Sequence, residues 1–265
     1  MNHFQNKTIW ITGASSGIGE ALAYKFSEAG ARLILSARRG SELERVKKNC
    51  KNAENNIYIL PLDLEKTETM NEAVKEALSF SERIDYLINN GGISQRSLVY
   101  ETSLEVDRKI MEINYFGTIA LTKAVLPVMM QQKSGHIAVT SSIVGKFGFP
   151  LRSAYSASKH ALHGFFETLR AELVDYNIHI SLIIPGRILT NISVNAITKN
   201  GEKYGLLDDG QANGMTAEEA AQKILNAMKK KRKEILVGKK EVLMVHIRRF
   251  LPRLYYKLAS KVSAV

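Results

Sequence analysis

The sequence predicts a single α/β domain in which a doubly wound parallel sheet carries helices on both faces. Six short runs of β-branched and apolar residues alternate with longer segments of helical periodicity, which is the pattern of parallel βαβ units. The 265 residues contain no repeat and no Pro- or Ser-rich linker, which favours one domain. The expected strands lie near 8–12, 33–36, 57–60, 86–89, 136–140 and 179–184.

The segments between these strands are expected to form the helices that cover the sheet. Stretches such as GIGEALAYKFSEAG and SASKHALHGFFETLRAEL carry apolar residues at helical spacing. Residues 187–214 contain Asn, Gly and Asp without clear periodicity, which indicates a loop insertion that can act as a lid over a substrate. We therefore divide the chain into a domain over 1–238 and an extension over 239–265.

Cysteine content and hydropathy favour a reducing, cytoplasmic setting. A single cysteine, Cys50, excludes an intramolecular disulfide framework and a Cys-rich metal site, and we expect no bound metal. The first residues, MNHFQNK, lead into the first strand without the segments of a secretory leader. No apolar run reaches the roughly 18 residues of a membrane-spanning helix. These observations predict a cytoplasmic protein.

The net charge of +11 is concentrated at one end of the chain. Residues 229–265 contain twelve lysines and arginines against Glu234 and Glu241, so the preceding residues carry a net charge of only +1. The basic segment contains no recognised nucleic-acid-binding motif, and we expect no nucleic-acid partner.

The C-terminal extension has the pattern of a basic amphipathic helix. Pro252 is expected to divide it into two helices. Such a segment can pack on its own domain or form a subunit contact, which we favour, or it can bind a membrane surface. Its expected apolar face comprises Leu243, Ile247, Phe250, Leu251, Leu254 and Leu258, flanked by Arg248, Arg249, Arg253 and Lys257.

A glycine-rich turn follows the first strand and precedes a helical segment. Its sequence, TGASSGIG, runs from Thr12 to Gly19. Glycine lets the backbone turn tightly and approach a pyrophosphate, whose charge is favoured by free N–H groups and the positive end of the helix dipole. This strand–turn–helix context is typical of a Rossmann-type dinucleotide-binding domain.

The residues after the second and third strands point to one form of the dinucleotide. Arg38 and Arg39 stand where an NAD-binding domain usually places an acidic residue for the adenosine ribose diol. Arg38, which comes sooner after the strand, can pair with a 2′-phosphate, so the sequence predicts NADP(H). Asp63 can cap the next helix or accept a hydrogen bond from the adenine amino group.

Three residues in the second half of the chain have the chemistry of a proton-transfer site. Tyr155 and Lys159 are four residues apart on an expected helix, so they share one helix face. A nearby ammonium favours the phenolate of a tyrosine, whose ordinary pKa is about 10. Ser142, at the end of the fifth strand, can hold a substrate oxygen while Tyr155 exchanges its proton.

From Lys7 to about Gly238, the chain resembles the short-chain dehydrogenase/reductase family. TGASSGIG matches the family's TGxxxGxG, YSASK matches its YxxxK, and Ser142 lies thirteen residues before Tyr155, where the family's catalytic serine falls. NNGG corresponds to the family's NNAG, with Gly91 replacing alanine, a departure that the backbone geometry should survive. PGRILT, which begins at Pro185, matches the family's PGxxxT.

The resemblance implies roles for these residues. Tyr155 would be the catalytic acid or base, Ser142 would orient the carbonyl, and Lys159 would lower the tyrosine pKa and bind the nicotinamide ribose. Asn114, in EINYFG, would hold a water in a proton relay through the lysine. Together, the residue patterns and the resemblance give these expected cofactor-binding residues: Gly13, Ser15, Ser16, Gly17, Ile18, Gly19, Arg38, Asp63, Asn90, Gly91, Tyr155, Lys159, Pro185, Gly186, Ile188 and Thr190.

The resemblance implies an NADP(H)-dependent oxidoreductase that transfers a hydride between the nicotinamide and a carbonyl or secondary alcohol. NYFGTIALTKAVLP is similar to the subgroup around dehydrogenase/reductase member 7 and 11β-hydroxysteroid dehydrogenase, which implies a lipophilic ketone or aldehyde such as a steroid, retinoid or xenobiotic, with Phe147 and Phe149 lining the pocket. A 3-oxoacyl-thioester reductase and a catalytically silent dinucleotide-sensing protein are the alternatives. Family habit implies a homodimer or homotetramer built on the helices of Asn114 and Tyr155.

Overall fold

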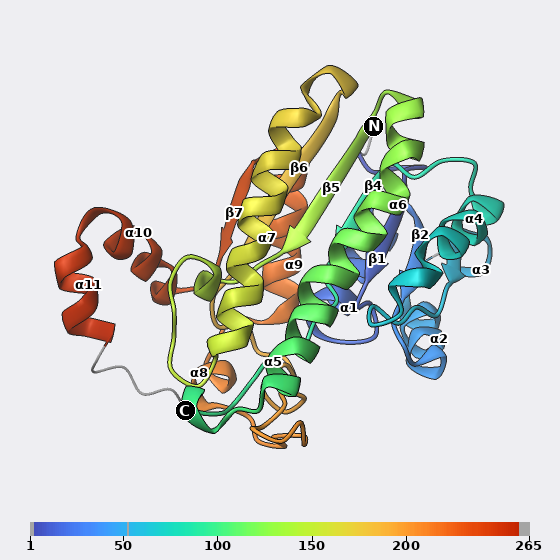
Figure 1. The fold of residues 1–265 in the computed structure, drawn as a ribbon. Helices are drawn as coiled ribbons and strands as arrows, with labels where there is room; N and C mark the ends of the chain where they lie inside the picture. Colours follow the sequence, from blue (N-terminus) through green and yellow to red (C-terminus); the bar gives the residue numbers. More distant parts are fainter. Residues whose placement is uncertain (1–2, 52, 260–265) are drawn as a thin grey trace.

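The computed structural model, which describes residues 3–51 and 53–259, contains a seven-stranded parallel sheet between two layers of helices (Figure 1). This confirms the predicted fold class. Six strands agree with the expected ranges to within one residue at each end. The strands run over Thr8–Thr12 (β1), Arg32–Ser36 (β2), Ile57–Ile59 (β3), Tyr86–Asn89 (β4), Gly135–Thr140 (β5), Ile178–Pro185 (β6) and Glu234–Val237 (β7).

The seventh strand, β7, was missed by the sequence analysis. Its four residues directly follow a run of lysines and arginines, so the strand is too short to show a clear alternation of apolar and polar residues. The strand pairs in parallel with β6 and buries Ile235 and Val237. It therefore forms the edge of the sheet next to β6.

The order of the strands creates a crevice in the middle of the sheet. The order is β3-β2-β1-β4-β5-β6-β7, so the chain moves outward from β1 and then returns to its other side at β4. Crossovers leave β1 and β4 in opposite directions, which opens a space beyond the carboxyl ends of these strands. Thr12 and Asn89 end the two strands at this place.

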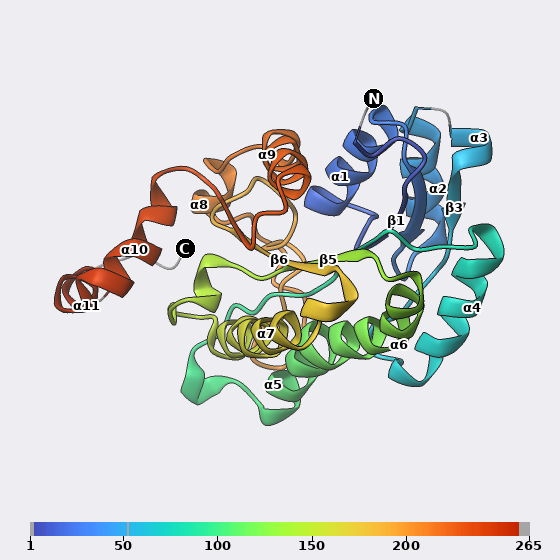
Figure 2. The ribbon, with the colours of Figure 1, turned by 90° about the horizontal axis from the view of Figure 1, so that it is seen from above.

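Helices cover both faces of the sheet (Figure 2). Residues of α1, α2 and α9 pack in one buried cluster, and residues of α4, α6 and α7 pack in the other. The helices run over Gly17–Glu28 (α1), Gly40–Asn49 (α2), Ala53–Asn56 (α3), Met70–Phe80 (α4), Leu104–Met111 (α5), Gly117–Gln132 (α6), Ser153–Glu172 (α7), Asp209–Ala212 (α8), Ala217–Lys229 (α9), Leu243–Phe250 (α10) and Pro252–Ala259 (α11).

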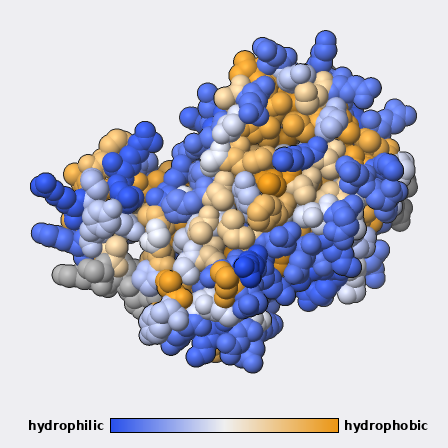
Figure 3. Space-filling model, viewed as in Figure 1, coloured by the Kyte–Doolittle hydropathy of each residue, from blue (hydrophilic) through white to orange (hydrophobic). Residues whose placement is uncertain are grey.

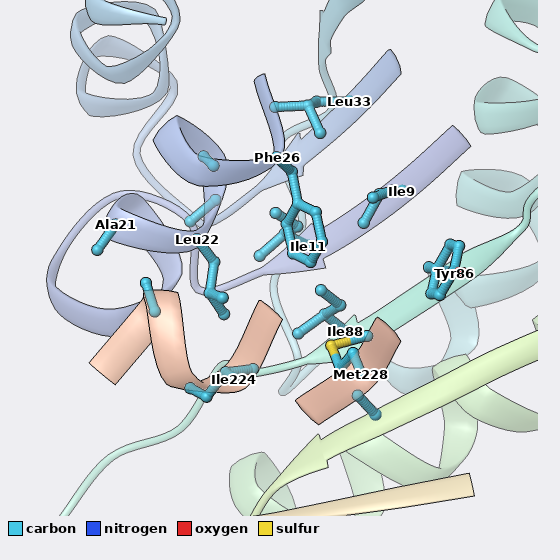
Figure 4. Close-up of a cluster of buried hydrophobic side chains, with 14 of the residues drawn as sticks. Ile9, Ile11, Ala21, Leu22, Phe26, Leu33, Tyr86, Ile88, Ile224 and Met228 are labelled. Atoms are coloured by element: carbon cyan, nitrogen blue, oxygen red, sulfur yellow. The ribbon is translucent and has the colours of Figure 1, made fainter. Parts of the chain in front are cut away.

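The central strand β1 divides its side chains between the two clusters. Ile9 and Ile11 lie on the side of α1, near Phe26 (Figure 4). Trp10 points to the opposite side, where it packs with α4 and α6 and donates a hydrogen bond to the Ser36 hydroxyl at 2.8 Å. The side chains of Ile9, Trp10 and Ile11, and that of Phe26 in α1, are fully buried. Since each such burial contributes about 1.5–3 kcal/mol, β1 is held firmly between the two layers.

One continuous helical stretch, Leu104–Gln132, contains α5, a π-helical turn over Glu112–Phe116, and α6. Among the described residues it is the one helix that is long and apolar enough to cross a membrane by composition, with a mean hydropathy of 1.3. The sequence analysis expected none. Leu121, Val125 and Met129 of this stretch are fully buried against the sheet, so it is a weakly apolar helix that packs in the core of the domain.

The C-terminal extension forms α10 and α11, which meet at Pro252 as expected and project from the domain (Figures 1 and 2). Tyr255 attaches it by packing against Phe147 and donating a hydrogen bond to the Gly148 carbonyl at 3.0 Å. Most of the large members of the expected apolar face do not pack on the domain, so the partner of this face stays a prediction. Residues 260–265 of the extension lie outside the described residues. The exposed members are Leu243, Phe250, Leu251 and Leu254, which are 43–69% exposed.

Candidate active site

A cavity of about 800 Å³ lies beyond the carboxyl ends of the central strands. Of the sequence-predicted site residues, Gly19 and Asn114 are outside its lining. All the others line it: Gly13, Ser15, Ser16, Gly17, Ile18, Arg38, Asp63, Asn90, Gly91, Ser142, Tyr155, Lys159, Pro185, Gly186, Ile188 and Thr190. The fold thus brings together residues that are up to 177 positions apart in the chain.

The glycine turn after β1 is shaped by close backbone contacts. Gly13 has a φ of +63°, and a Cβ added there would lie 2.8 Å from the Cα of Gly91. A Cβ on Gly19 would collide with the Gly13 carbonyl, so the packing of the helix against the turn requires glycine at this position. Only glycine meets both demands at Gly13, a positive φ and a close approach.

The same turn presents the N-terminus of α1 to the cavity. The helix begins at Gly17, and its N-cap residue, Ser16, makes no side-chain capping bond. The first N–H groups of a helix have no partner within the helix, and the helix dipole adds partial positive charge there. This end of the cavity is therefore suited to an anionic group such as a pyrophosphate.

The NNGG segment after β4 packs against the glycine turn. The backbone N–H groups of Asn90 and Gly91 both donate to the Thr12 hydroxyl at 3.0 Å. The Asn90 side chain donates to the Gly13 carbonyl at 3.3 Å. A Cβ on Gly91 would lie 2.6 Å from the Cδ1 of Leu64, so the glycine in place of the family's alanine leaves room for this leucine.

Arg38 and Asp63 line the cavity near the ends of β2 and β3. The Arg38 side chain is exposed. Asp63 does not cap the next helix, because its carboxylate accepts from the Glu65 N–H at 3.1 Å within a turn that precedes α4. The helix-capping interpretation of Asp63 is therefore wrong, and the adenine interpretation stays a prediction.

Tyr155 and Lys159 lie one turn apart on α7, beside Ser142 at the end of β5. The Nζ of Lys159 donates to the Thr140 carbonyl at 2.7 Å and lies 5.7 Å from the centre of the Tyr155 ring. Burial lowers the pKa of Lys159 to about 8. Ser142 caps a short 3₁₀ turn, where its hydroxyl accepts from the Val144 N–H.

The pKa of Tyr155 reflects opposing effects. Burial raises this pKa, whereas a hydrogen bond with Ser142 and the positive charges of Arg96 and Arg152 lower it. The sequence predicted the lowering effect from Lys159, whereas in the structure Ser142, Arg96 and Arg152 lower this pKa. A tyrosine whose protonation depends on such contacts, at the wall of a cavity, has the properties of an acid–base group.

Asn114 lies behind the cavity, in the π-helical turn between α5 and α6. Its side chain accepts from the Ile93 N–H at 2.8 Å and donates to the Ile93 carbonyl and to the Ser158 hydroxyl. A Cβ on Gly92 would lie 2.9 Å from the Oδ1 of Asn114 and 3.6 Å from the Nζ of Lys159. Asn114 therefore fixes the backbone after β4 against the helix that carries Tyr155. Its role in a water relay stays a prediction.

Comparison with known proteins decides the family. The model of the short chain dehydrogenase family matches residues 7–201. The chain belongs to the short-chain dehydrogenase/reductase family. This confirms the resemblance inferred from the motifs. The family consists of oxidoreductases that bind a nicotinamide dinucleotide and act on small molecules, so the chain is an oxidoreductase.

The curated relatives of this family member carry consistent names. Dehydrogenase/reductase SDR family protein 7-like of Drosophila melanogaster is 45% identical, over 98% of this chain and 81% of that protein. Dehydrogenase/reductase SDR family member 7B of Mus musculus is 43% identical, over 97% and 81%. Dehydrogenase/reductase SDR family member 7 of Homo sapiens is 44% identical, over 96% and 77%. The similarity thus covers nearly the whole chain.

Solved structures of the family share the fold. A short-chain dehydrogenase from Streptomyces avermitilis has a TM-score of 0.83 and 27% identity, over 99% of this chain and 100% of that one. A short chain dehydrogenase from Burkholderia cenocepacia, in complex with NADP, has a TM-score of 0.80 and 23% identity, over 97% and 98%. One from Burkholderia phymatum, in complex with NAD, has a TM-score of 0.84 and 23% identity, over 96% of each chain.

The substrate end of this dehydrogenase/reductase contains an ion cluster that the sequence analysis missed. Arg96 and Arg152 both line the cavity and both donate to the carboxylate of Asp208 at 2.9 Å. Arg96 follows the NNGG segment, and Asp208 belongs to the loop over 187–214. Residue types alone gave no signal, because arginine and aspartate at such positions are usually solvated.

The loop over 187–214 lines the cavity and reaches the glycine turn through Thr190. Apart from α8 it contains no helix or strand in the described part of the chain, as expected. Ile188 pairs with Met215, and the Thr190 side chain would lie 3.0 Å from a Cβ on Gly17. Phe149 lines the cavity as expected, whereas Phe147 packs beneath Tyr255 of the extension and is absent from the lining.

Proposed function

We propose that the protein is an NADP(H)-dependent oxidoreductase that transfers a hydride between the nicotinamide and a carbonyl or secondary alcohol of a lipophilic ketone or aldehyde. The observation that carries this proposal is the meeting of Ser142, Tyr155 and Lys159 at the wall of the cavity that the glycine turn also lines. Steroids, retinoids and xenobiotic ketones are the substrate types that we would examine first.

The cavity fits a dinucleotide. The contact of Gly13 with Gly91 leaves no room for a side chain in the glycine turn, as a close backbone approach to a pyrophosphate requires. In the proposal, the N-terminus of α1 holds the pyrophosphate, and Lys159 and Tyr155 face the nicotinamide ribose. The exposed guanidinium of Arg38 would pair with a 2′-phosphate, and this is what favours NADP(H) over NAD(H).

In the proposed mechanism, the substrate oxygen lies between the hydroxyls of Ser142 and Tyr155. Tyr155 donates its proton to this oxygen when a carbonyl is reduced, and it accepts the proton when an alcohol is oxidised. Ser142 polarises the carbonyl by donating a hydrogen bond. A nicotinamide dinucleotide, when bound, would supply or accept the hydride at the carbon of the carbonyl or alcohol. Lys159, with a pKa of about 8, supplies positive charge near the phenolate at neutral pH.

The substrate half of the cavity supports a lipophilic substrate. Several of its lining side chains are apolar and come from the segment after β5 and from the loop over 187–214. A 3-oxoacyl-thioester reductase is the alternative enzyme, and a catalytically silent dinucleotide-sensing protein is the alternative without turnover. The apolar lining residues at this end include Ile143, Val144, Phe149, Ile192 and Ile197.

The face formed by α6 and α7 supports the proposal of a homodimer or homotetramer. Figure 3 shows hydrophobic surface gathered over these two helices. Phe116 is 45% exposed there, and Ala120, Ala124 and Phe165 are only partly buried. Contiguous apolar surface of this kind is typical of subunit contacts.

The extension supports two proposals for the partner of α10 and α11. Arg249 and Arg253 alternate with exposed Phe250 and Leu254, which is the composition of a helix at an anionic membrane surface. The anchoring of Tyr255 on Phe147 supports packing on the domain or next to a second subunit. We propose a cytoplasmic protein in either case, with peripheral membrane contact as the second alternative.

The test of the proposed function is the oxidation of NADPH and NADH across aldehydes, diketones, steroids, retinal and acetoacetyl thioesters. Turnover with NADPH that falls in the Tyr155→Phe variant would support the proposal, and the preferred substrates would separate lipophilic carbonyls from thioesters. Tight NADPH binding without turnover across the panel would favour the sensing role instead.

A further inference from the structure

Three side chains at the junction of α7 and β7 form a cluster of nitrogen and oxygen donors outside the cavity. His163 and Glu167 lie one helical turn apart on α7, and Glu234 is the first residue of β7. One donor atom from each side chain lies within 4.8 Å of the other two. The two carboxylates are partly exposed, whereas the imidazole is buried.

The buried imidazole has one nitrogen without a hydrogen-bond partner. The His163 side chain is only 9% exposed, and its Nδ1 has no hydrogen-bond partner among the described residues. This nitrogen points toward Glu167, whose Oε1 lies 3.7 Å away, which is too far for a hydrogen bond. Buried polar atoms are nearly always satisfied, so an unpartnered nitrogen calls for an explanation.

The position of the proton on the ring follows from its second nitrogen. The Nε2 of His163 lies 2.9 Å from the hydroxyl oxygen of Ser141, and that hydroxyl donates its own proton to the Lys159 carbonyl. When the Ser141 hydroxyl proton lies on the bond to the Lys159 carbonyl, the serine oxygen accepts from Nε2–H, which leaves the lone pair of the neutral ring on Nδ1.

In this tautomer, the lone pair on Nδ1 and the carboxylate of Glu167 face each other at 3.7 Å with no proton between them. Two acceptors in this arrangement repel each other, and a cation between them would remove the repulsion. A histidine whose other nitrogen donates to a hydroxyl or carbonyl is the usual arrangement at metal sites, because that bond fixes the ring and its tautomer. Ser141 provides this bond here.

We propose that His163, Glu167 and Glu234 bind a divalent transition-metal ion, with zinc as the first candidate. Imidazole nitrogen and carboxylate oxygen are both zinc ligands, and in zinc sites with three protein ligands water occupies the fourth position. Zinc bonds of about 2.0–2.2 Å in a tetrahedron separate the ligand atoms by about 3.4 Å. The two partly exposed glutamates can rotate by the small distance that separates the present spacing from this one.

Lys146 opposes the metal in this site. Its Nζ lies 2.7 Å from the Oε1 of Glu234 and competes for the same carboxylate. The ammonium must move aside when the ion binds, so removal of Lys146 should strengthen binding. Tighter zinc binding after removal of Lys146 would distinguish a site that includes Glu234 from unspecific binding of zinc to other histidines of the chain.

The experiment is titration of the full-length, chelator-treated protein with ZnCl₂ in a calorimeter, with Co²⁺ absorption as a second readout of the ligands. Glu167→Gln removes one ligand from an exposed position, and Glu172→Gln on the same helix is the matched control. We expect wild type and Glu172→Gln to bind one equivalent alike, Glu167→Gln to bind at least about tenfold more weakly, and Lys146→Met to bind more tightly.

Equal zinc affinity in wild type and Glu167→Gln, or no binding by either wild type or Lys146→Met, would overturn the proposal. His163→Gln should lose the Co²⁺ bands that nitrogen ligation produces. If that variant does not fold, the two surface variants still decide the question. None of these measurements requires turnover, so the result is independent of the proposed oxidoreductase substrate.

Discussion

The guanidinium of Arg96 and the carboxylate of Asp208 form a buried ion pair that ties the loop over 187–214 to the segment after β4. The Nε of Arg96 lies 2.9 Å from the Oδ2 of Asp208, and both side chains are at most 3% exposed. Arg152 donates to the same carboxylate oxygen. The pair therefore holds the substrate loop and places positive charge near Tyr155 at the same time.

The variant Arg96→Gln should shift the pH profile and weaken substrate binding. Arg96 lowers the pKa of Tyr155, so its removal raises that pKa, and the rising limb of alcohol oxidation moves to higher pH because this reaction requires the phenolate. The loop also loses one partner, so KM should rise. Rates of alcohol oxidation against pH, with KM at each pH, measure both effects.

Asp208→Asn is the control for Arg96→Gln. It also loosens the loop, but it leaves both arginine charges near Tyr155. KM should rise in this variant as well, while the rising limb should stay or move to lower pH. A shift of the limb in the same direction in both variants would show that loop position, and not charge, sets the pKa of Tyr155.

Tyr155→Phe should lower turnover at least about 10²-fold, since general acid–base catalysis contributes roughly 10²–10⁴. NADPH binding should change little, because the substitution removes one hydroxyl and keeps the ring. Stopped-flow turnover and NADPH fluorescence titration separate the two effects. Retained turnover would mean that another group supplies the proton.

Arg38→Leu should shift the cofactor preference from NADPH toward NADH. A charge-assisted hydrogen bond contributes about 1.5–3 kcal/mol. The Kd for NADH divided by the Kd for NADPH should therefore fall about 10- to 100-fold in the variant. Arg39→Leu is the matched control, because Arg39 also lines the cavity and is also exposed. If the control shows the larger loss, the 2′-phosphate partner is Arg39.

His136 should make the fold sensitive to acid. Burial, with help from His179 and Lys231, lowers the pKa of His136 from 6.5 to about 3. Below pH 6.5 the imidazole is protonated in the unfolded chain but stays neutral in the folded one. The free energy of unfolding therefore falls as the pH falls toward 3. Between pH 6.5 and pH 4.5 this residue should cost about 2 kcal/mol. Urea unfolding of wild type and His136→Gln should show a flatter loss of stability in the variant.

Removal of the extension should distinguish its two proposed roles. A chain that ends at Gly238 should float less with anionic liposomes than the full chain if α10 and α11 bind a membrane surface. Equal flotation of the two chains, together with a lower subunit count of the shorter one in light scattering, would instead support a protein contact.

The sequence predicted the strands near the cavity well, because their apolar runs are bounded by glycine motifs with a defined backbone function. Of the residues that it predicted for cofactor binding, all but Gly19 line the cavity, since a few ordered motifs determine them. It missed β7, which is too short to show a period. The Arg96–Asp208 pair and the cluster of His163, Glu167 and Glu234 were also missed, since both join segments far apart in the chain. The leucines of the extension were assigned by periodicity, whereas its attachment depends on Tyr255, which periodicity does not single out.

The contact between Gly13 and Gly91 limits which amino-acid substitutions this protein can tolerate during evolution. At the glycine turn, the cavity is lined by backbone in contact with backbone, where a side chain added at Gly13 or Gly91 would collide. Another part of the lining consists of side chains on the loop over 187–214, which is held by an ion pair and contributes only α8 as regular structure in the described part of the chain. Mutations can therefore accumulate in the loop and alter which molecules are accepted, while the glycine contact keeps the reaction itself unchanged.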